Sequence, residues 1–328
     1  MNELSLSGTI ITFDLDYFST FMDFFEITNS IIILFIMMAI GYAAYRMKVI
    51  DRQGAKGLSS FLVNISLPCL IIVSMQIPLT EETFGSTIEM FAVAAVYYLI
   101  SFAFAFAIPR FLSKDIHEIG VMKFMLVFSN LGFMGIPVTA AIFGTGAVFY
   151  TSLVMLPFGL LVFSAGILML RQDMGNSLDP KLFLNSGILS SLIGLVFFFT
   201  GFSIPSPFID VLQILGDLTT TLAMVVVGAL LATLPISGMF GDLRIYFISF
   251  LRLIAIPFAV YLVLTPFVKD PLFIGIAVLL ASMPVAANSV LLAEEYDVDS
   301  TLASKGVFIS TLLSLITVPV VAVLLISV

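Results

Sequence analysis

The chain has 328 residues, of which 60% are hydrophobic and only 10% are charged. This balance excludes a soluble globular domain, in which about 25% of residues are charged, and it indicates a polytopic membrane protein that folds as one bundle. The net charge of -8 provides no basic patch for a nucleic-acid partner. Cys69 is the single cysteine, so an intrachain disulfide is excluded.

The N-terminal arm, residues 1–27, interleaves acidic and aromatic side chains ahead of the first long apolar segment. This pattern is typical of an amphipathic arm outside the membrane core, and a disordered arm is the alternative. Ten apolar segments follow, each near the length of about 20 residues that crosses a bilayer. They span residues 28–46, 57–77, 88–109, 119–142, 147–170, 184–201, 211–234, 244–267, 271–293 and 302–327.

The basic residues support this count and predict the orientation. If the ten segments alternate across the bilayer, every Lys and Arg except Lys269 lies on one side. Because short cytoplasmic loops are enriched in Lys and Arg, the odd-numbered loops are predicted to be cytoplasmic and both termini extracytoplasmic. We therefore expect a multi-pass protein of the cell membrane.

The fourth segment contains a stretch that a plain spanning helix would not carry, Ser129-Asn130-Leu131-Gly132-Phe133-Met134-Gly135-Ile136-Pro137. Gly132 and Gly135 weaken a helix, and Pro137 removes a backbone N–H and clashes with the preceding turn. Asn130 brings an amide into hydrocarbon, which costs free energy unless the amide has a partner. A kinked helix whose glycines let a neighbour pack closely is the alternative.

A second interrupted segment is the ninth, with Ser282-Met283-Pro284-Val285-Ala286-Ala287-Asn288-Ser289. Broken segments in corresponding positions of two halves point to a transporter's substrate site. The halves are residues 28–170 and 171–328, which together form one transporter domain, 28–328. Because each half has an odd number of segments, the predicted fold is all-α, with ten transmembrane helices in two inverted five-helix repeats.

Several motifs resemble those of the auxin efflux carrier family. The stretch from Ser129 to Pro137 is similar to its fourth-helix motif. Other matches are Met283-Pro284 followed by Ala293-Glu294-Glu295-Tyr296-Asp297-Val298 (ninth helix and its loop), Asn64 to Leu70 (second helix) and Arg252 to Pro257 (eighth helix). The order and spacing of these motifs extend the resemblance over residues 28–328.

This resemblance implies export or facilitated transport of small organic anions, such as indole acetate in plants and dicarboxylates in some bacteria. It also implies a scaffold of helices 1, 2, 6 and 7, a mobile transport domain, alternating access of the elevator type, and a homodimer. Helices 4 and 9 would cross at their breaks, where the family's asparagine maps onto Asn130 and its proline onto Pro137. Plant members have a second proline where this chain has Ser289, beside Asn288, so the polarity of the site differs there.

The chemistry of a broken helix favours an anion. The second half of such a helix begins with unpaired N–H groups and the positive end of the helix dipole. The predicted substrate-binding residues are Asn130, Gly132, Gly135, Pro137, Pro284, Asn288 and Ser289. The two asparagines would add amide donors, and an interhelical hydrogen bond is the alternative role for each.

Four further positions are candidates for other roles. Arg252 could neutralise an anion, but its depth in the eighth segment favours a side chain that snorkels to the cytoplasmic interface. Asp217 could be an ion or proton site for charge coupling, although a solvated helix end is favoured. Asn64 and Pro68 predict a kink in the second segment, which is either a wall of the cavity or a packing feature.

An enzyme, a metal site and a cofactor are not expected. The sole histidine, His117, lies in a predicted loop, and the sequence has no His-Glu-x-x-His motif. We expect a secondary transporter that moves a small organic anion, such as a carboxylate, by efflux or uniport. Because neither break holds a carboxylate, electrogenic transport without obligatory ion coupling is predicted. A Na⁺- or H⁺-coupled symporter of the same architecture and a membrane sensor that binds without transport are the alternatives.

Overall fold

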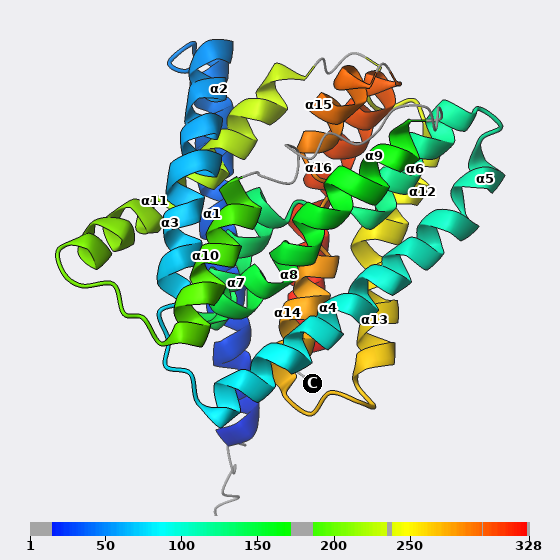
Figure 1. Ribbon diagram of the computed structural model, residues 1–328. Helices are drawn as coiled ribbons and strands as arrows, with labels where there is room; N and C mark the ends of the chain where they lie inside the picture. Colours follow the sequence, from blue (N-terminus) through cyan, green and yellow to red (C-terminus); the bar gives the residue numbers. More distant parts are fainter. Residues whose placement is uncertain (1–14, 172–185, 235–237, 297, 327–328) are drawn as a thin grey trace, which may run out of the picture.

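The computed structural model describes residues 15–171, 186–234, 238–296 and 298–326, and these residues are helical apart from connections and one isolated extended pair (Figure 1). In chain order the helices are α1 (Leu15–Arg46), α2 (Arg52–Phe61), α3 (Leu67–Ser74), α4 (Glu81–Ala107), α5 (Pro109–Leu112), α6 (Ile116–Val127), α7 (Ile136–Phe143), α8 (Ala147–Leu161), α9 (Ile167–Leu170), α10 (Ser186–Thr200), α11 (Phe208–Thr233), α12 (Leu243–Phe250), α13 (Ile256–Leu264), α14 (Pro271–Ala281), α15 (Asn288–Glu295) and α16 (Ser300–Ile326).

Among the described residues, seven helical segments are long and apolar enough to cross a membrane. The shorter apolar helices are Leu131–Phe143, Ser186–Thr200 and Pro271–Ala281. The first and last of these are halves of interrupted segments, and the second begins where the described chain resumes. The membrane-protein class is therefore confirmed, whereas the count of ten spans stays a prediction.

The first helix is longer than the hydropathy of the sequence indicated. It begins at Leu15, inside the stretch that we predicted as an arm before the membrane core. Acidic side chains lower the hydropathy of this stretch without preventing a helix, since Asp and Glu have only modest helix penalties. Residues 1–14 lie outside the described residues.

Four π-helical turns interrupt the helices of the described residues, at Leu62–Ser66, Leu131–Gly135, Val162–Gly166 and Leu251–Ala255. Three of them end two residues before a proline, namely Pro68, Pro137 and Pro257. A proline in a helix clashes with the carbonyl four residues earlier, and the wider turn relieves that clash. The hydrogen bond just before each of these prolines spans five residues, as from the Ile136 N–H to the Leu131 carbonyl.

The helices form two groups. In the first group, α11 packs on α1, α2 and α3, and α10 packs on α3. The backbones of α1 and α11 touch, because a Cβ at Gly228 would lie 1.9 Å from the Met38 carbonyl oxygen and one at Gly41 would lie 2.1 Å from that of Val225. Small residues join membrane helices in this way. The second group contains α4, α6, α7, α8, α12, α13, α14, α15 and α16, and so holds both halves of each interrupted segment, while α7 also packs on α1.

Figure 1 shows the first group, with α1 to α3 in blue, along one flank, and α12 and α13 in yellow along the other. The helices α14 and α16, in orange and red, stand between them. The start of α1 lies toward one end of the bundle, while the connection from α1 to α2, together with α5, lies toward the opposite end.

Candidate functional site

The two interrupted helices cross at their breaks and pair through their backbones. The Asn130 N–H donates to the Pro284 carbonyl at 2.8 Å, and the Ala286 N–H donates to the Phe128 carbonyl at 3.0 Å. The residues between form an isolated antiparallel bridge. Backbone groups inside a membrane must find partners within the protein, and here each break supplies partners for the other.

Side chains from neighbouring helices satisfy the groups at the edges of this bridge. The Val285 N–H donates to the Ser310 hydroxyl of α16 at 3.0 Å. On the opposite side of the bridge, the Ser129 hydroxyl shares a hydrogen bond of 3.0 Å with the Tyr97 hydroxyl of α4. All four residues are buried, so the centre of the crossing is a closed polar network in an apolar core.

Asn130 caps the second half of its helix. Its Oδ1 accepts from the Phe133 N–H at 3.3 Å, and its carbonyl accepts from the N–H groups of Met134 and Gly135. Within the described residues its Nδ2 makes no hydrogen bond. The Asn130 side-chain oxygen therefore accepts a hydrogen bond from the helix N-terminus, as in many N-caps. The side-chain nitrogen is left as a donor for a ligand.

The glycines of the fourth-helix stretch differ in how tightly they are packed. A Cβ at Gly135 would lie 2.9 Å from the Leu280 side chain of α14, so this glycine lets the two broken helices approach. A Cβ at Gly132 would meet Leu67 and Met155 only at ordinary contact distances. Pro137 is buried in the first turn of α7 and fixes the π-helical turn before it.

Arg252 is fully buried and does not reach the membrane surface. Its Nη1 donates to the Leu126 carbonyl at 2.8 Å and its Nε to the Met283 carbonyl at 3.3 Å. The expectation that Arg252 snorkels to the cytoplasmic interface is therefore wrong. The physical reason is that α6 and α14 both end beside it, and helix ends offer free carbonyls and a negative dipole end that hold a cation inside the protein.

Tyr97 connects this guanidinium to the crossing. Nη2 of Arg252 donates to the Tyr97 hydroxyl at 2.9 Å, and the guanidinium carbon lies 5.9 Å from the centre of the Tyr97 ring. The tyrosine hydroxyl is then free to donate to Ser129. Sequence reasoning missed both Tyr97 and Ser310, since a tyrosine or serine in an apolar segment carries no local signal of what it contacts.

The more open side of the crossing lies where the second half-helices begin. Gly132, Phe133, Ala287 and Asn288 are partly exposed there. The Asn288 side chain makes no hydrogen bond within the described part of the chain. The hydroxyl of Ser289, a residue only 2% exposed, is buried without a partner. Polar groups without partners beside a helix N-terminus are suited to hold an anion.

The remaining predicted residues lie away from the crossing. Asp217 is exposed on α11 and accepts a hydrogen bond from the Gln213 amide. Asn64 is also exposed, and its Oδ1 accepts from the Ser186 hydroxyl of α10. Pro68 is partly buried at the start of α3. The second segment faces the crossing through Leu67, which lies next to Gly132, and not through Asn64.

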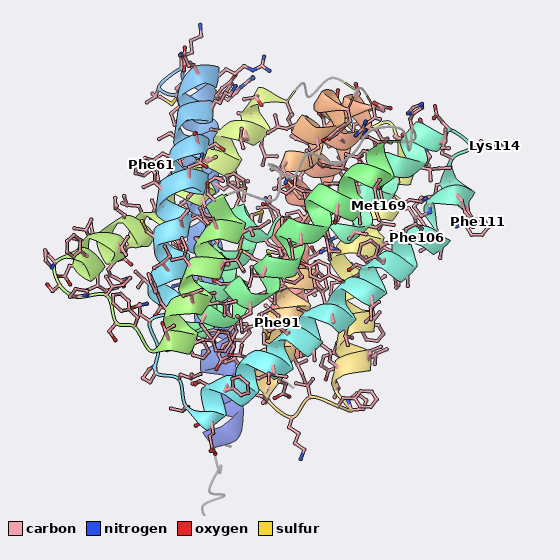
Figure 2. The ribbon with its side chains drawn as sticks, viewed as in Figure 1. Phe61, Phe91, Phe106, Phe111, Lys114 and Met169 are labelled. Carbon is pink, nitrogen blue, oxygen red and sulfur yellow. The ribbon has the colours of Figure 1, made fainter. Side chains whose placement is uncertain are left out.

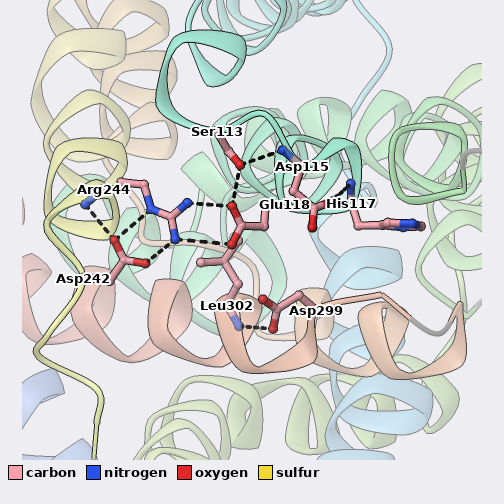
Figure 3. A network of polar contacts seen from close by, with 8 residues as sticks. All are labelled: Ser113, Asp115, His117, Glu118, Asp242, Arg244, Asp299 and Leu302. Atoms are coloured by element: carbon pink, nitrogen blue, oxygen red, sulfur yellow. Dashed lines mark hydrogen bonds and ion pairs between the residues drawn. The ribbon is translucent and has the colours of Figure 1, made fainter.

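A polar network lies at the N-terminal end of the fourth segment (Figure 3). Arg244, at the start of α12, pairs with Glu118 of α6 at 2.6 Å and with Asp242 at 2.8 Å. The adjacent guanidinium holds the pKa of the Glu118 carboxyl below its usual range, and the hydroxyl of Ser113 adds to this effect. The pKa of Asp242 is lowered by the same guanidinium. In the described residues, no group of three or more His, Cys, Asp or Glu side chains could hold a metal ion.

An apolar helical bundle whose two broken helices pair at their breaks, with polar groups left without partners on one side, has the architecture of a membrane carrier. The chain belongs to the membrane transport protein family, whose family model matches residues 26–180 and 172–322. This is the family of the auxin efflux carriers, so the resemblance seen in the motifs is confirmed.

Relatives with curated names support the same class. The chain is 27% identical over 306 residues to a putative malonate transporter of Rhizobium meliloti (strain 1021), covering 89% of this chain and 94% of that protein. It is 26% identical over 312 residues to an uncharacterized transporter of Methanothermobacter thermautotrophicus, covering 93% and 100%. It is 21% identical over 301 residues to the uncharacterized transporter YfdV of Escherichia coli (strain K12), covering 87% and 93%.

Proposed function

We propose that this protein is a secondary transporter of a small organic anion, specifically a carboxylate. The observation that carries the proposal is the set of polar groups without partners at the start of both second half-helices, with the buried Arg252 at the ends of the first half-helices. A relative is named as a putative malonate transporter. Malonate, a small dicarboxylate, is therefore the first substrate to test.

In the proposed binding mode, a carboxylate lies against the N-terminal ends of the second half-helices. The Nδ2 of Asn130, the side chain of Asn288 and the hydroxyl of Ser289 donate to it, together with backbone N–H groups at Gly132. Gly135, Pro137 and Pro284 shape the crossing without contributing charge. Arg252 contacts the opposite ends, those of the first half-helices, so it stabilises the crossing and adds a positive potential without touching the anion.

The proposed movement is an elevator-type alternation of the two helix groups. The first group would be the scaffold and the centre of a homodimer, and the second would carry the crossing. The reciprocal backbone pairing of the breaks supports an inverted repeat. The contact between Tyr97 and Arg252 also supports an inverted repeat. These residues come from the third and eighth predicted segments, and they meet beside the two first half-helices. We further propose that both termini are extracytoplasmic in the cell membrane.

The charge of the site supports electrogenic transport. Among the described residues no carboxylate hydrogen-bonds to the residues of the crossing, which is what a site without a proton or sodium carboxylate predicts. Arg252 partly offsets the charge of a bound anion, but a complete cycle still moves the charge of the anion. The membrane potential, negative inside, would drive that charge outward with about 2.3 kcal/mol per 100 mV.

Counterflow in proteoliposomes tests the proposal against its alternatives. Vesicles loaded with unlabelled malonate should accumulate labelled malonate transiently, because a carrier exchanges substrate across the membrane. A sensor would bind malonate without counterflow, which would overturn the proposed function. Net flux that ignores an imposed potassium-diffusion potential but follows a Na⁺ or pH gradient would instead favour the coupled symporter.

A further inference from the structure

A groove of about 400 Å³ lies on the lateral surface between α4, α6 and α9. Its lining includes Phe106 of α4, Lys123 of α6, and Leu168 and Arg171 at the end of α9. In Figure 2, Phe106 and Met169 lie on facing helices near the end of the bundle that carries Lys114. This groove shares no residue with the crossing.

The floor of the groove is a close helix contact. A Cβ at Gly120 would lie 2.2 Å from the Met169 carbonyl oxygen, so α6 and α9 touch there without a side chain between them. The walls are apolar and open to the surroundings, since Leu168 is 55% exposed and Phe106 is 47% exposed. On a bundle that spans a membrane, such a lateral apolar face lies against lipid chains.

Two cations, Lys123 and Arg171, face this groove. Lys123 lies over the Phe106 ring, 5.0 Å from its centre, and Arg171 lies 5.6 Å from the centre of the Tyr296 ring. Within the described residues neither forms an ion pair. The nearby Glu118 is occupied by Arg244.

The depth of Lys123 matches a lipid headgroup. Lys123 is four residues inside the predicted fourth segment, which begins at residue 119, so at 1.5 Å per residue it lies roughly 6 Å along the helix from that boundary. The interfacial region of a bilayer is about 5–8 Å thick on each side. Phe111 of α5, 83% exposed, lies near the same end, as expected for an interfacial anchor (Figure 2).

We propose that this groove binds an anionic phospholipid. Its phosphate lies between Lys123 and Arg171, and one acyl chain follows Phe106 and Leu168. Basic pockets between membrane helices at the headgroup level bind anionic headgroups in this way. A free phosphate would use the cations but would leave the apolar walls uncovered. The proposal does not depend on which anion the protein transports.

The test counts bound lipids by native mass spectrometry of the purified protein in detergent. Phosphatidylglycerol should bind at least tenfold more tightly to the wild type than to the Lys123→Gln/Arg171→Gln variant. The matched control is Arg110→Gln/Lys114→Gln, which removes the same charge from exposed positions at the same end, outside the groove lining. This control should bind phosphatidylglycerol like the wild type.

A second variant separates the lipid from a soluble anion. Ala165→Phe fills the groove without changing charge, so it should weaken phosphatidylglycerol binding, and inorganic phosphate at equal concentration should not compete with the lipid. Phosphatidylcholine should bind the wild type and the charge variant equally. Equal losses in the groove variant and the control, or displacement of the lipid by inorganic phosphate, would overturn the proposal.

Discussion

Replacing Arg252 by leucine should weaken the crossing of the broken helices. The guanidinium makes three contacts, with the carbonyls of Leu126 and Met283 and with the Tyr97 hydroxyl. Leucine fills similar apolar space but donates to none of them. The carbonyl ends of α6 and α14 would then face each other without a donor.

The magnitude follows from the two buried carbonyls. Each buried acceptor that loses its partner costs about 1–3 kcal/mol, so the pair costs roughly 2–6 kcal/mol. Removing the buried charge offsets part of this free-energy cost, because desolvating a guanidinium is itself unfavourable by several kcal/mol. We expect a net destabilisation near 2 kcal/mol. Arg252→Lys keeps the charge but not the fork that spans two helix ends, so its effect should be smaller.

Thermal unfolding of the purified variants measures this effect, with Arg52→Leu as the matched control. Arg52 is exposed at the start of α2, so its loss should leave the Tm unchanged. Arg252→Leu should lower the Tm by several degrees and should reduce the maximal transport rate more than the apparent affinity. A Tm equal to that of the wild type would show that the guanidinium does not hold the crossing, and the reasoning would fail.

Three further predictions follow from the site and the topology. Asn130→Ala should lose an N-cap worth about 1 kcal/mol and should impair transport. Asn130→Asp should restore the Tm but not transport, because its carboxylate repels the anion. Normal transport by the alanine variant would show that Asn130 is purely structural. The ion pair of Glu118, whose pKa is lowered by Arg244 and Ser113, should stabilise the protein above the ordinary carboxyl pKa and lose that effect as the pH falls through the lowered pKa. Glu118→Gln should flatten this part of a Tm-against-pH profile, and an unchanged profile would contradict the assignment. In a Cys69→Ser background, an impermeant thiol reagent should label Thr83→Cys but not Lys56→Cys in intact cells; the reverse pattern would invert the topology.

The sequence predicted the membrane class and the positions of both interruptions because these depend on local chemistry. Gly132, Gly135 and Pro137 disfavour a regular helix wherever they lie in space. The prolines likewise indicated the kink near Pro68, although the π-helical form of each kink was not predicted. The helix α1 extends back to Leu15, into the predicted arm, because hydropathy measures membrane preference and not helix length.

The partners of the site residues could not be predicted, because they come from distant parts of the chain. Arg252 is buried only because α6 and α14 end beside it, which no local window of the sequence reveals. Asn64 shares its segment with the residue that faces the crossing, Leu67, but points to α10 instead. Residues three apart share a face of a regular α-helix, but the π-helical turn at Leu62–Ser66 changes the angle between Asn64 and Leu67, and the sequence does not reveal that turn.

The Ser289 hydroxyl offers the most direct test of the proposed anion site. It is buried without a partner, so Ser289→Ala should leave stability unchanged or raise it, since an unsatisfied buried hydroxyl is unfavourable. If the hydroxyl donates to a bound carboxylate, the same change removes a charge-assisted hydrogen bond of about 1.5–3 kcal/mol. Equilibrium binding of labelled malonate should then weaken by about tenfold or more, while the Tm without ligand does not fall. Unchanged malonate affinity in a stable Ser289→Ala protein would contradict an anion site at the crossing.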